Sequence, residues 1–458
     1  MTRVVMLGGG YVTLHAYAQL VRRLGHRVRS GELEILVISA DDCHSFHGFT
    51  GEVVAGILPL ERTRTPLARA MPLATVVHGR ATHVDTATRT VSFVRHGSRT
   101  TEQVGYAELV LGTGGQEPRS SVPGLAEHGF TLRGVGEIGG LAEHLRTLLA
   151  GLPEREAARV GVRDDPRRRV VVAGGGVAGT ELAAAVADLG GGRLDVLLVH
   201  GGEQLLPELR GSHPRLADQV ELELSRLGVR TRLGTRLTRV TGQGAVLTGE
   251  AGPGTPTLHP AATVLATIGQ VPVVVPGTED LARDPGGRLL TDPDLSVVLA
   301  PGVWSAGDAA RVLHPVTGRP VATNALWAIK AGAHMGRNLA RRLQGRPTRP
   351  FAYRGLGQAA SYGLGRSVAE IYGLELTGGA AWLLRVTFFL RFMPTRRGAA
   401  AVARDLAGVL LTGERVPEAP EAPEHVLREA DGQRAEEREV PRPGEVVPRG
   451  AGLATWTT

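Results

Sequence analysis

The sequence predicts an α/β protein built around two similar strand–turn–helix units. Apolar, largely β-branched runs at 4–7 and 170–173 each lead into a glycine-rich turn, Gly8-Gly9-Gly10 and Gly174-Gly175-Gly176, and each turn opens a helical pattern. In such a unit a buried parallel strand feeds a helix whose N-terminus faces a pyrophosphate, and the glycines let backbone N–H groups approach the phosphates. Two copies in this context predict two Rossmann-like dinucleotide-binding domains.

The composition fits this fold class and excludes several others. The chain has 458 residues, 42% of them hydrophobic, and 63 glycines, which suits two or three domains with many tight turns. Its single cysteine, Cys43, excludes an internal disulfide, a redox cysteine pair and a zinc site with several thiolates, and no metal site is predicted. The first apolar run belongs to a Rossmann strand, so we expect no signal peptide and a cytoplasmic protein.

Three further strand ends carry polar or glycine residues typical of a flavin site. Two strands end in Thr113-Gly114 and Thr267-Ile-Gly269, and a third ends in Gly307-Asp308, where the acid can bond the ribityl and phosphate region of a flavin. This order resembles the two-dinucleotide-binding-domain flavoproteins over about residues 1 to 345. Within that superfamily the chain is most similar to the type II NADH dehydrogenases, which pass electrons from a nicotinamide to membrane quinone.

The resemblance implies that the first domain holds FAD and that an NAD(P)H domain is inserted into it. A basic and aromatic region follows, and we expect it to be helical and to associate with a membrane. The chain ends in a proline- and glutamate-rich tail, which we expect to be disordered. The FAD domain is expected at 1–122 and again at 273–345, the NAD(P)H domain between them at 123–272, the C-terminal region at 346–415 and the tail at 416–458.

The resemblance also implies which residues hold FAD. They are the first glycine turn with the start of its helix and the later strand ends, namely Gly8, Gly10, Tyr11, Thr113, Gly114, Gly269, Gly307 and Asp308. The family places an acid for the adenosine ribose at the end of the second strand, but here that strand ends in Ser39, with Asp41 just beyond. Ser39 can donate or accept one hydrogen bond, and Asp41 can reach the ribose only from a longer loop.

In the second domain the resemblance implies that Gly174, Gly176 and Gly179 hold the nicotinamide cofactor's pyrophosphate. Glu181 matches the motif glutamate that relatives place near flavin and nicotinamide, although a glutamate in a first helical turn also complements the helix dipole. The next strand ends in His200, where NADH-preferring relatives carry an acid. Because histidine repels a 2′-phosphate less than an acid does, this position allows the use of NADPH. A second alternative is that nicotinamide binding has been lost.

Two more residues are candidates for catalysis. Lys330 is the only lysine of the chain, and it falls in the helical segment that follows Gly307-Asp308. In this segment the type II dehydrogenases carry a quinone-binding motif with two glutamines. Leu326 and Lys330 stand in place of these glutamines here. Its ammonium could bond a quinone carbonyl or stabilise reduced flavin, or it could be a surface lysine.

His44 matches a loop histidine of the dehydrogenases, with Glu52 following, and either could relay protons or simply pack.

Positive charge and aromatic residues coincide near the C-terminus. Between Arg337 and Arg404 there are twelve arginines and two glutamates, and the span from Phe351 to Met393 holds eight of the 18 aromatic residues. The run 380–393 is too short to span a bilayer, and Val402, Leu406, Val409 and Leu410 share one helical face. This mixture suits a membrane interface, while packing between the helices or a dimer interface is the alternative. No nucleic-acid-binding fold accompanies it.

The function expected from these features is that of an FAD-dependent NAD(P)H dehydrogenase that reduces a quinone at the inner face of the cell membrane. A homodimer is expected from the resemblance alone. One alternative is a soluble reductase of a ferredoxin- or rubredoxin-type carrier, which the basic region would dock. Another is a flavin-binding redox sensor with little turnover, suggested by Ser39, His200 and the missing glutamines.

Overall fold

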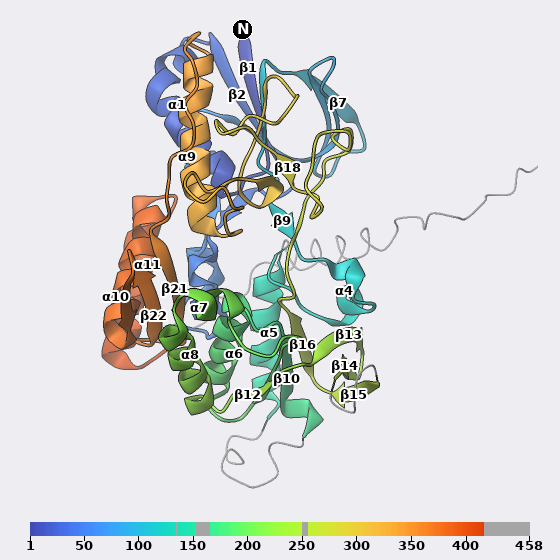
Figure 1. Ribbon diagram of the computed structural model, residues 1–458, viewed down its shortest axis with the longest axis vertical. Helices are drawn as coiled ribbons and strands as arrows, with labels where there is room; N and C mark the ends of the chain where they lie inside the picture. Colours follow the sequence, from blue (N-terminus) through green and yellow to red (C-terminus); the bar gives the residue numbers. More distant parts are fainter. Residues whose placement is uncertain (134–135, 153–164, 250–254, 416–458) are drawn as a thin grey trace, which may run out of the picture. The chain divides into compact units, whose positions relative to one another are not determined.

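The computed structural model describes residues 1–133, 136–152, 165–249 and 255–415, so the predicted tail at 416–458 lies outside the described residues. Its largest sheet has the strand order β19-β8-β1-β2-β5-β6-β7 (Figure 1). The bounds of these strands are β1 Thr2–Leu7, β2 Leu33–Ser39, β5 Thr75–Asp85, β6 Thr90–Arg95, β7 Thr101–Gly105, β8 Glu108–Leu111 and β19 Val303–Ser305. The pairs from β19 to β5 are parallel, and the apolar strands β19, β8, β1 and β2 are almost fully buried, as in sheets covered on both faces.

A second parallel sheet, β12-β11-β10-β16, is formed by the segment between β8 and β19. Its strands are β10 Arg169–Ala173, β11 Asp195–Val199, β12 Arg230–Arg232 and β16 Thr263–Ala266, and its helices include α5 Glu137–Ala150, α6 Val177–Gly190 and α8 Pro214–Arg226. An antiparallel sheet of β13 Arg236–Thr241, β14 Gly244–Thr248 and β15 Pro256–Pro260 accompanies it. The chain passes between the two domains twice, and the two connecting segments pair with each other as the short strands β9 Gly115–Gln116 and β17 Val271–Pro272.

This topology confirms the predicted architecture, because β19 returns to the first sheet only after the second sheet is complete. The exact domain bounds given above stay a prediction. The shorter elements are β3 Cys43–Ser45, β4 Arg64–Pro66, β18 Leu289–Leu290, β20 Ala310–Arg311, α2 Thr50–Val54, α3 Leu67–Ala70, α4 Leu125–His128 and α7 Pro207–Ser212.

Two long helices of the first domain, α1 (Tyr11–Arg29) and α9 (Ala325–Arg342), lie side by side (Figure 1). Two glycines of α9 allow the backbones to approach. A Cβ atom on Gly332 would lie 2.5 Å from the Val12 carbonyl oxygen, and one on Gly336 would lie 2.2 Å from that of Ala16. Since a larger side chain at either position would separate the helices, this contact fixes α9 against the start of α1.

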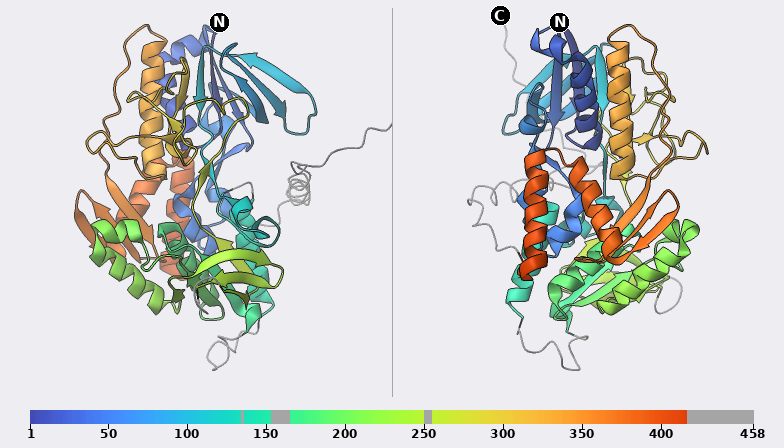
Figure 2. Two further views of the ribbon diagram at one scale, coloured as in Figure 1. Left: turned by 45° about the vertical axis from the view of Figure 1, so that its right-hand side comes forward. Right: turned by 90° about the vertical axis from the view of Figure 1, so that its left-hand side faces the viewer.

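The C-terminal region corrects one prediction, because it is not purely helical. It begins with an antiparallel sheet of β21 Gly357–Ser361, β22 Ser367–Ile371 and β23 Leu374–Thr377. Helices α10 (Gly378–Phe392) and α11 (Arg396–Thr412) follow and lie side by side in the right view of Figure 2. Gly363 lies between β21 and β22, and Tyr372 and Gly373 lie between β22 and β23, all at positive φ, which favours the hairpins that the helical interpretation missed.

Burial removes part of the predicted aromatic and apolar set of the C-terminal region from its surface, and membrane association stays a prediction. Phe351, Tyr362 and Trp382 are buried, so these aromatic residues contribute to packing and not to an outer surface. On α11 the predicted apolar face is buried at Val402, Leu406 and Val409, whereas Leu410 is 52% exposed. That face therefore packs within the protein, which was the alternative interpretation. Among the described residues, no helix is long and apolar enough to cross a membrane.

Candidate functional site

The first glycine turn has the geometry of a phosphate-binding turn. Gly8 has φ +91°, and a Cβ atom there would lie 2.6 Å from the Gly112 carbonyl oxygen, so only glycine fits. Gly10 is the N-cap of α1, whose first turn carries no acidic residue and no side-chain cap. The N–H groups at this helix start therefore suit an anionic ligand, and the turn fits the pyrophosphate of FAD.

The later strand ends lie beside this turn. Gly112 contacts Gly8, and Thr113 follows it, donating its hydroxyl to the Val273 carbonyl oxygen at 2.9 Å. Gly114 and Gly269 adopt positive φ at the two crossings between the domains, +67° and +108°. The structure thus places these predicted residues where the first domain meets the second.

Ser39 ends β2 and is buried, and its hydroxyl accepts the N–H of Asp41 at 3.3 Å. Burial raises the pKa of Asp41, a shift that Arg64 opposes. The serine thus organises the start of the acidic loop in which the family's ribose-binding acid is missing.

Asp308 lies at the other side of the expected flavin site, in the short turn after β19. Its carboxylate pairs with Arg133 at 2.7 Å, and a Cβ atom on the preceding Gly307 would lie 2.9 Å from Val12 and 3.3 Å from Ala328. The turn is therefore held against the start of α1 and against α9. Arg133 was not predicted, because nothing in its local sequence distinguishes it from the other arginines.

His44 lies beneath the first glycine turn. Its Nδ1 is 2.9 Å from the Gly9 carbonyl oxygen, and burial lowers the pKa of the imidazole to about 4. The ring is thus neutral at pH 7 and donates from Nδ1, while Nε2 is buried with no partner among the described residues. Tyr11 stacks edge-on against His44, with ring centroids 4.8 Å apart, and its hydroxyl accepts the N–H of His47. Both residues shape the turn.

The second glycine turn is even more tightly packed. A Cβ atom on Gly179 would lie 1.8 Å from the Gly174 carbonyl oxygen, and one on Gly174, where φ is +122°, would lie 2.4 Å from that of Thr267. Gly176 is the N-cap of α6 and leaves that helix start without a side-chain cap. This is the close helix–strand packing that a dinucleotide-binding turn requires.

His200 follows β11 and reaches back to this turn, where its Nδ1 accepts the N–H of Gly175 at 3.2 Å. Burial lowers the pKa of the imidazole, and the nearby Arg236 lowers it further. At neutral pH the position of the family's acid is therefore occupied by an uncharged ring beside a cation.

Glu181 belongs to a buried charge cluster that joins three segments of the chain. The sequence pattern predicts Glu181 in the first turn of α6, but it lies in the second turn. Interaction with the helix dipole therefore does not explain a glutamate at this position. Its carboxylate accepts the N–H of Ser361 at 2.7 Å and lies 3.7 Å from Arg385 of α10. Burial raises the pKa of Glu181 to about 7, although Arg385 acts in the opposite direction.

Arg385 is the centre of that cluster. Its side chain is 3% exposed, pairs with Glu52 of α2 at 2.6 Å and donates to the Gly48 carbonyl oxygen at 2.7 Å. Burial alone would lower the pKa of the guanidinium, but the carboxylates of Glu52 and Glu181 raise it. Glu52 is thus an ion-pair partner. The position of Arg385 in the middle of the apolar run 380–393 was a sign in the sequence that this arginine is buried and paired. From the sequence, it was instead counted among the basic residues of a surface.

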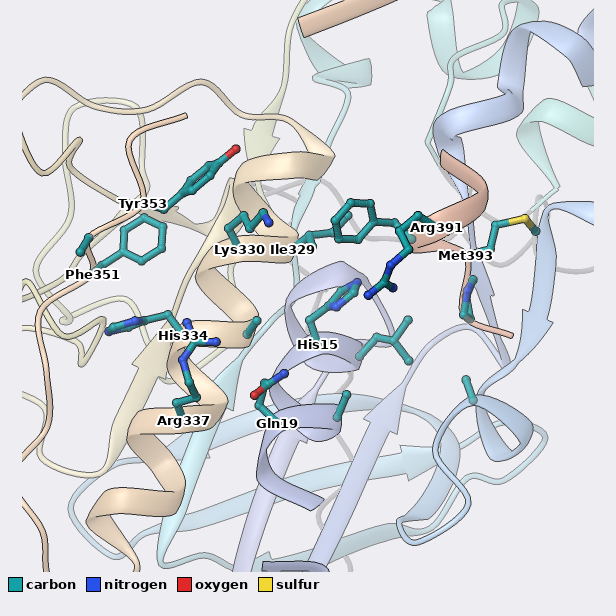
Figure 3. A pocket seen from close by; sticks show the side chains of 17 residues that line it. His15, Gln19, Ile329, Lys330, His334, Arg337, Phe351, Tyr353, Arg391 and Met393 are labelled. Carbon is teal, nitrogen blue, oxygen red and sulfur yellow. The ribbon is translucent and has the colours of Figure 1, made fainter. Parts of the chain in front are cut away.

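Lys330 projects from α9 into a pocket of about 630 Å³ between α1, α9, the segment 351–353 and the end of α10 (Figure 3). Its ammonium lies 5.4 Å from the ring centres of both Tyr353 and Phe392. Burial lowers the pKa of Lys330, and so do Arg337 and Arg391. The lysine therefore lines a pocket, and its side chain is only partly exposed.

This pocket and the expected FAD turn share two helices. Ala328 of α9 approaches Gly307, next to Asp308, and Lys330 lies two residues further along the same helix. On α1, Tyr11 begins the helix at the glycine turn, and His15 one turn later lines the pocket. A ligand in the pocket would therefore lie one helical turn from the residues expected to hold the flavin.

Comparison with known proteins agrees with this arrangement. Residues 2–332 match the family model described as pyridine nucleotide-disulphide oxidoreductase. A demethylphylloquinone reductase of Synechocystis sp. is 27% identical over 402 residues, covering 86% of this chain and 92% of that protein. An NADH dehydrogenase-like protein of Mycobacterium tuberculosis is 31% identical over 324 residues, covering 68% and 73%.

Among solved structures, NDH2 from Plasmodium falciparum in complex with NADH superposes with a TM-score of 0.76. The match covers 91% of this chain and 99% of that one, at 12% sequence identity. At this identity the likeness shows the shared fold, including the C-terminal region that the family model does not cover.

Proposed function

Because the chain belongs to the pyridine nucleotide-disulphide oxidoreductase family, we propose that it is an FAD-dependent NAD(P)H dehydrogenase that passes electrons to a quinone. Two relatives support this, one named for reduction of a quinone and one for its likeness to NADH dehydrogenase. The disulfide chemistry in the family's name does not suit this chain. Cys43 is its only cysteine, and burial raises the pKa of that thiol to about 11.

The observation that carries the proposal is the presence of two glycine turns on two different sheets, each beginning with a glycine, Gly8 and Gly174, at positive φ and with no room for a Cβ atom. We assign the first turn, with Tyr11, Ser39, Thr113, Gly114, Gly269, Gly307 and Asp308, to FAD. We assign Gly174, Gly176, Gly179 and His200 to NAD(P)H. FAD, when bound, would accept a hydride from the nicotinamide and pass the electrons on to the quinone.

The protein's own residues would position and tune this chemistry. Glu181, with a pKa near 7, can hold or release a proton at neutral pH where the second domain meets α10. His44 fixes the Gly9 carbonyl and with it the glycine turn, so we propose a positioning role for it. Lys330 would donate from its ammonium to a quinone oxygen in the pocket.

The test is anaerobic rapid mixing of the flavin-loaded protein with NADH or NADPH, followed by a quinone. We expect the visible absorbance of the flavin to bleach with at least one nucleotide and to return when menadione is added. Both nucleotides are compared because an uncharged His200 beside Arg236 does not repel a 2′-phosphate. Bleaching that no quinone reverses would favour a carrier reductase, and no bleaching at all would favour a sensor with little turnover.

We further propose that the protein associates with the inner face of the cell membrane through its C-terminal helices. Both helices carry exposed leucines or arginines, namely Leu383, Leu410, Leu411, Arg391, Arg396 and Arg397. Apolar side chains combined with cations suit an anionic lipid surface. A homodimer stays a proposal that rests on the resemblance.

Vesicle cosedimentation tests the membrane proposal. The protein is expected to sediment with phosphatidylglycerol vesicles at low salt and to remain in the supernatant with phosphatidylcholine, because cations contribute most at an anionic surface. Replacing both Leu410 and Leu411 with serine should weaken sedimentation without unfolding the protein, since these side chains are 52% and 86% exposed. A protein that stays soluble with both lipids would instead favour a soluble carrier as the acceptor.

A further inference from the structure

The pocket beside Lys330 carries an unbalanced positive charge. Its 17 lining residues include Lys330, Arg337 and Arg391 but no aspartate and no glutamate. Within the part of the chain that the structure describes, no carboxylate forms an ion pair with any of these three cations. They lie close enough to act on one another, since Arg337 and Arg391 both lower the pKa of Lys330. Lys330 and Arg337 are only partly exposed, whereas Arg391 is exposed at the edge of the pocket. Cations that are partly removed from water without a counter-charge favour an anionic ligand.

The other polar groups of the pocket do not supply the missing negative charge. Burial lowers the pKa of His15 to about 4, and it also lowers that of His334, so both rings are neutral at pH 7. His334 contacts the Arg349 carbonyl oxygen through Nε2 at 2.8 Å. The Nε2 of His15 and the hydroxyl of Tyr353 are buried and have no partner among the described residues.

The rest of the lining suits a flat apolar ring. Leu14, Ile329, Phe351, Phe392 and Met393 come from both helices of the first domain and from the C-terminal segments. A volume of about 630 Å³ is in the range of small-molecule sites, which are mostly apolar with a few polar anchors. The pocket therefore combines the walls of a quinone site with the charge of an anion site.

We propose that the acceptor of this enzyme is a quinone that carries an ionised acidic group, such as a carboxylate on a naphthoquinone ring. The inference rests on the proposed function. Lys330 and Arg391 would hold the anionic group and the adjacent quinone oxygen, and Arg337 would add to the field from the next turns of α9. Lys330 is then a specificity-determining residue, because its ammonium would contact the anionic group itself.

The reaction at the pocket is a two-electron reduction. The quinone gains two electrons from the reduced flavin and two protons, and it leaves as the quinol. NAD(P)H is the reductant and supplies one hydride, and solvent supplies the remaining proton. The anionic substituent is unchanged in this reaction, so it serves recognition only.

The test compares two quinones that differ by a fixed negative charge. The flavin is reduced anaerobically by light and a sacrificial donor, so that the result does not depend on nicotinamide binding. The reduced protein is then mixed with 1,4-naphthoquinone-2-sulfonate or with 1,4-naphthoquinone, and the half-saturating concentration for flavin reoxidation is measured. We expect the sulfonate to half-saturate at a concentration about 10-fold lower, because hydrogen bonds to charged groups are the stronger ones.

Variants assign the preference to the pocket. Lys330→Gln should weaken both quinones, because the ammonium donates to a quinone oxygen, but it should raise the half-saturating concentration of the sulfonate about 10-fold more than that of the neutral quinone. Lys330→Arg, which keeps the charge, should retain most of the preference. Arg22→Gln removes the same charge from the exposed face of α1, outside the pocket, and should change neither value.

Three outcomes would overturn the inference, and they are distinguishable. Equal half-saturation by both quinones, unchanged in Lys330→Gln, would refute the anionic acceptor but leave the quinone dehydrogenase intact. Reoxidation by neither quinone would refute both. If Lys330→Gln instead weakens sedimentation with phosphatidylglycerol vesicles and leaves the quinone values unchanged, the cations bind a lipid phosphate and not a substrate.

Discussion

Gly179→Ala is expected to reduce the rate of flavin reduction by NAD(P)H by about 100-fold, because a small misplacement of bound reactants has an effect of this size. The added Cβ atom would lie 1.8 Å from the Gly174 carbonyl oxygen, so α6 must move away from its strand and the pyrophosphate turn must open. The first sheet does not contain this turn, so flavin content should not change. Rapid mixing with NADH and NADPH measures the rate, and absorbance of the purified protein measures the flavin.

Gly211→Ala is the matched control, since it adds the same atom in the same domain and meets nothing within 4 Å. Photoreduced Gly179→Ala protein should still be reoxidised by a quinone at the unchanged rate. If Gly179→Ala reduces its flavin as fast as Gly211→Ala, the second glycine turn does not bind the nicotinamide cofactor.

Arg385→Met is expected to destabilise the protein by about 3–5 kcal/mol, because it leaves Glu52 buried without its counter-charge. The loss should be larger at pH 8 than at pH 5. Arg385 lowers the pKa of Glu181, so its removal raises that pKa above about 7 and makes the folded state retain the proton. Stability from a carboxyl with a raised pKa is present at low pH and is lost as the pH rises through the folded pKa. Denaturant unfolding at both pH values measures this.

A double variant, Glu52→Gln with Arg385→Met, separates the missing charge from the missing packing. It should recover much of the loss, because no ionised Glu52 is then left unpaired. Arg397→Met, at an exposed position of α11, should change stability by less than about 0.5 kcal/mol. A loss for Arg385→Met that is no larger than that of Arg397→Met would show that the cluster contributes little to the fold.

Local sequence was sufficient for the features of the site that depend on backbone geometry. Gly8 and Gly174 were identified because a strand, a turn and a helix leave a characteristic order of apolar residues and glycines, and both have positive φ in the structure. Asp308 was placed by the same logic at the end of a third strand. In each case the signal lies within a few residues, so no distant contact is needed to find it.

The charged and aromatic residues were harder to place, because their roles depend on partners far along the chain. Arg385 meets Glu52 across 333 residues, and Arg133 meets Asp308 across 175. Tyr362 and Trp382 were grouped with exposed aromatics, yet both are buried. Composition counts such residues together, whereas only packing separates a buried cation from one at the surface.

The sequence by itself determined two strand–turn–helix units and their glycine turns, because hydrophobic periodicity and glycine position express local backbone geometry. The insertion of one domain in the other was expected from the family resemblance, and the strand order of the first sheet shows it. Only the tertiary structure decided that Glu181, Arg385 and Glu52 form one buried cluster and that Lys330, Arg337 and Arg391 line one pocket without a carboxylate. The physical reason is that charge interactions depend on distance and burial in space, and both are set by how α1, α2, α6, α9 and α10 pack.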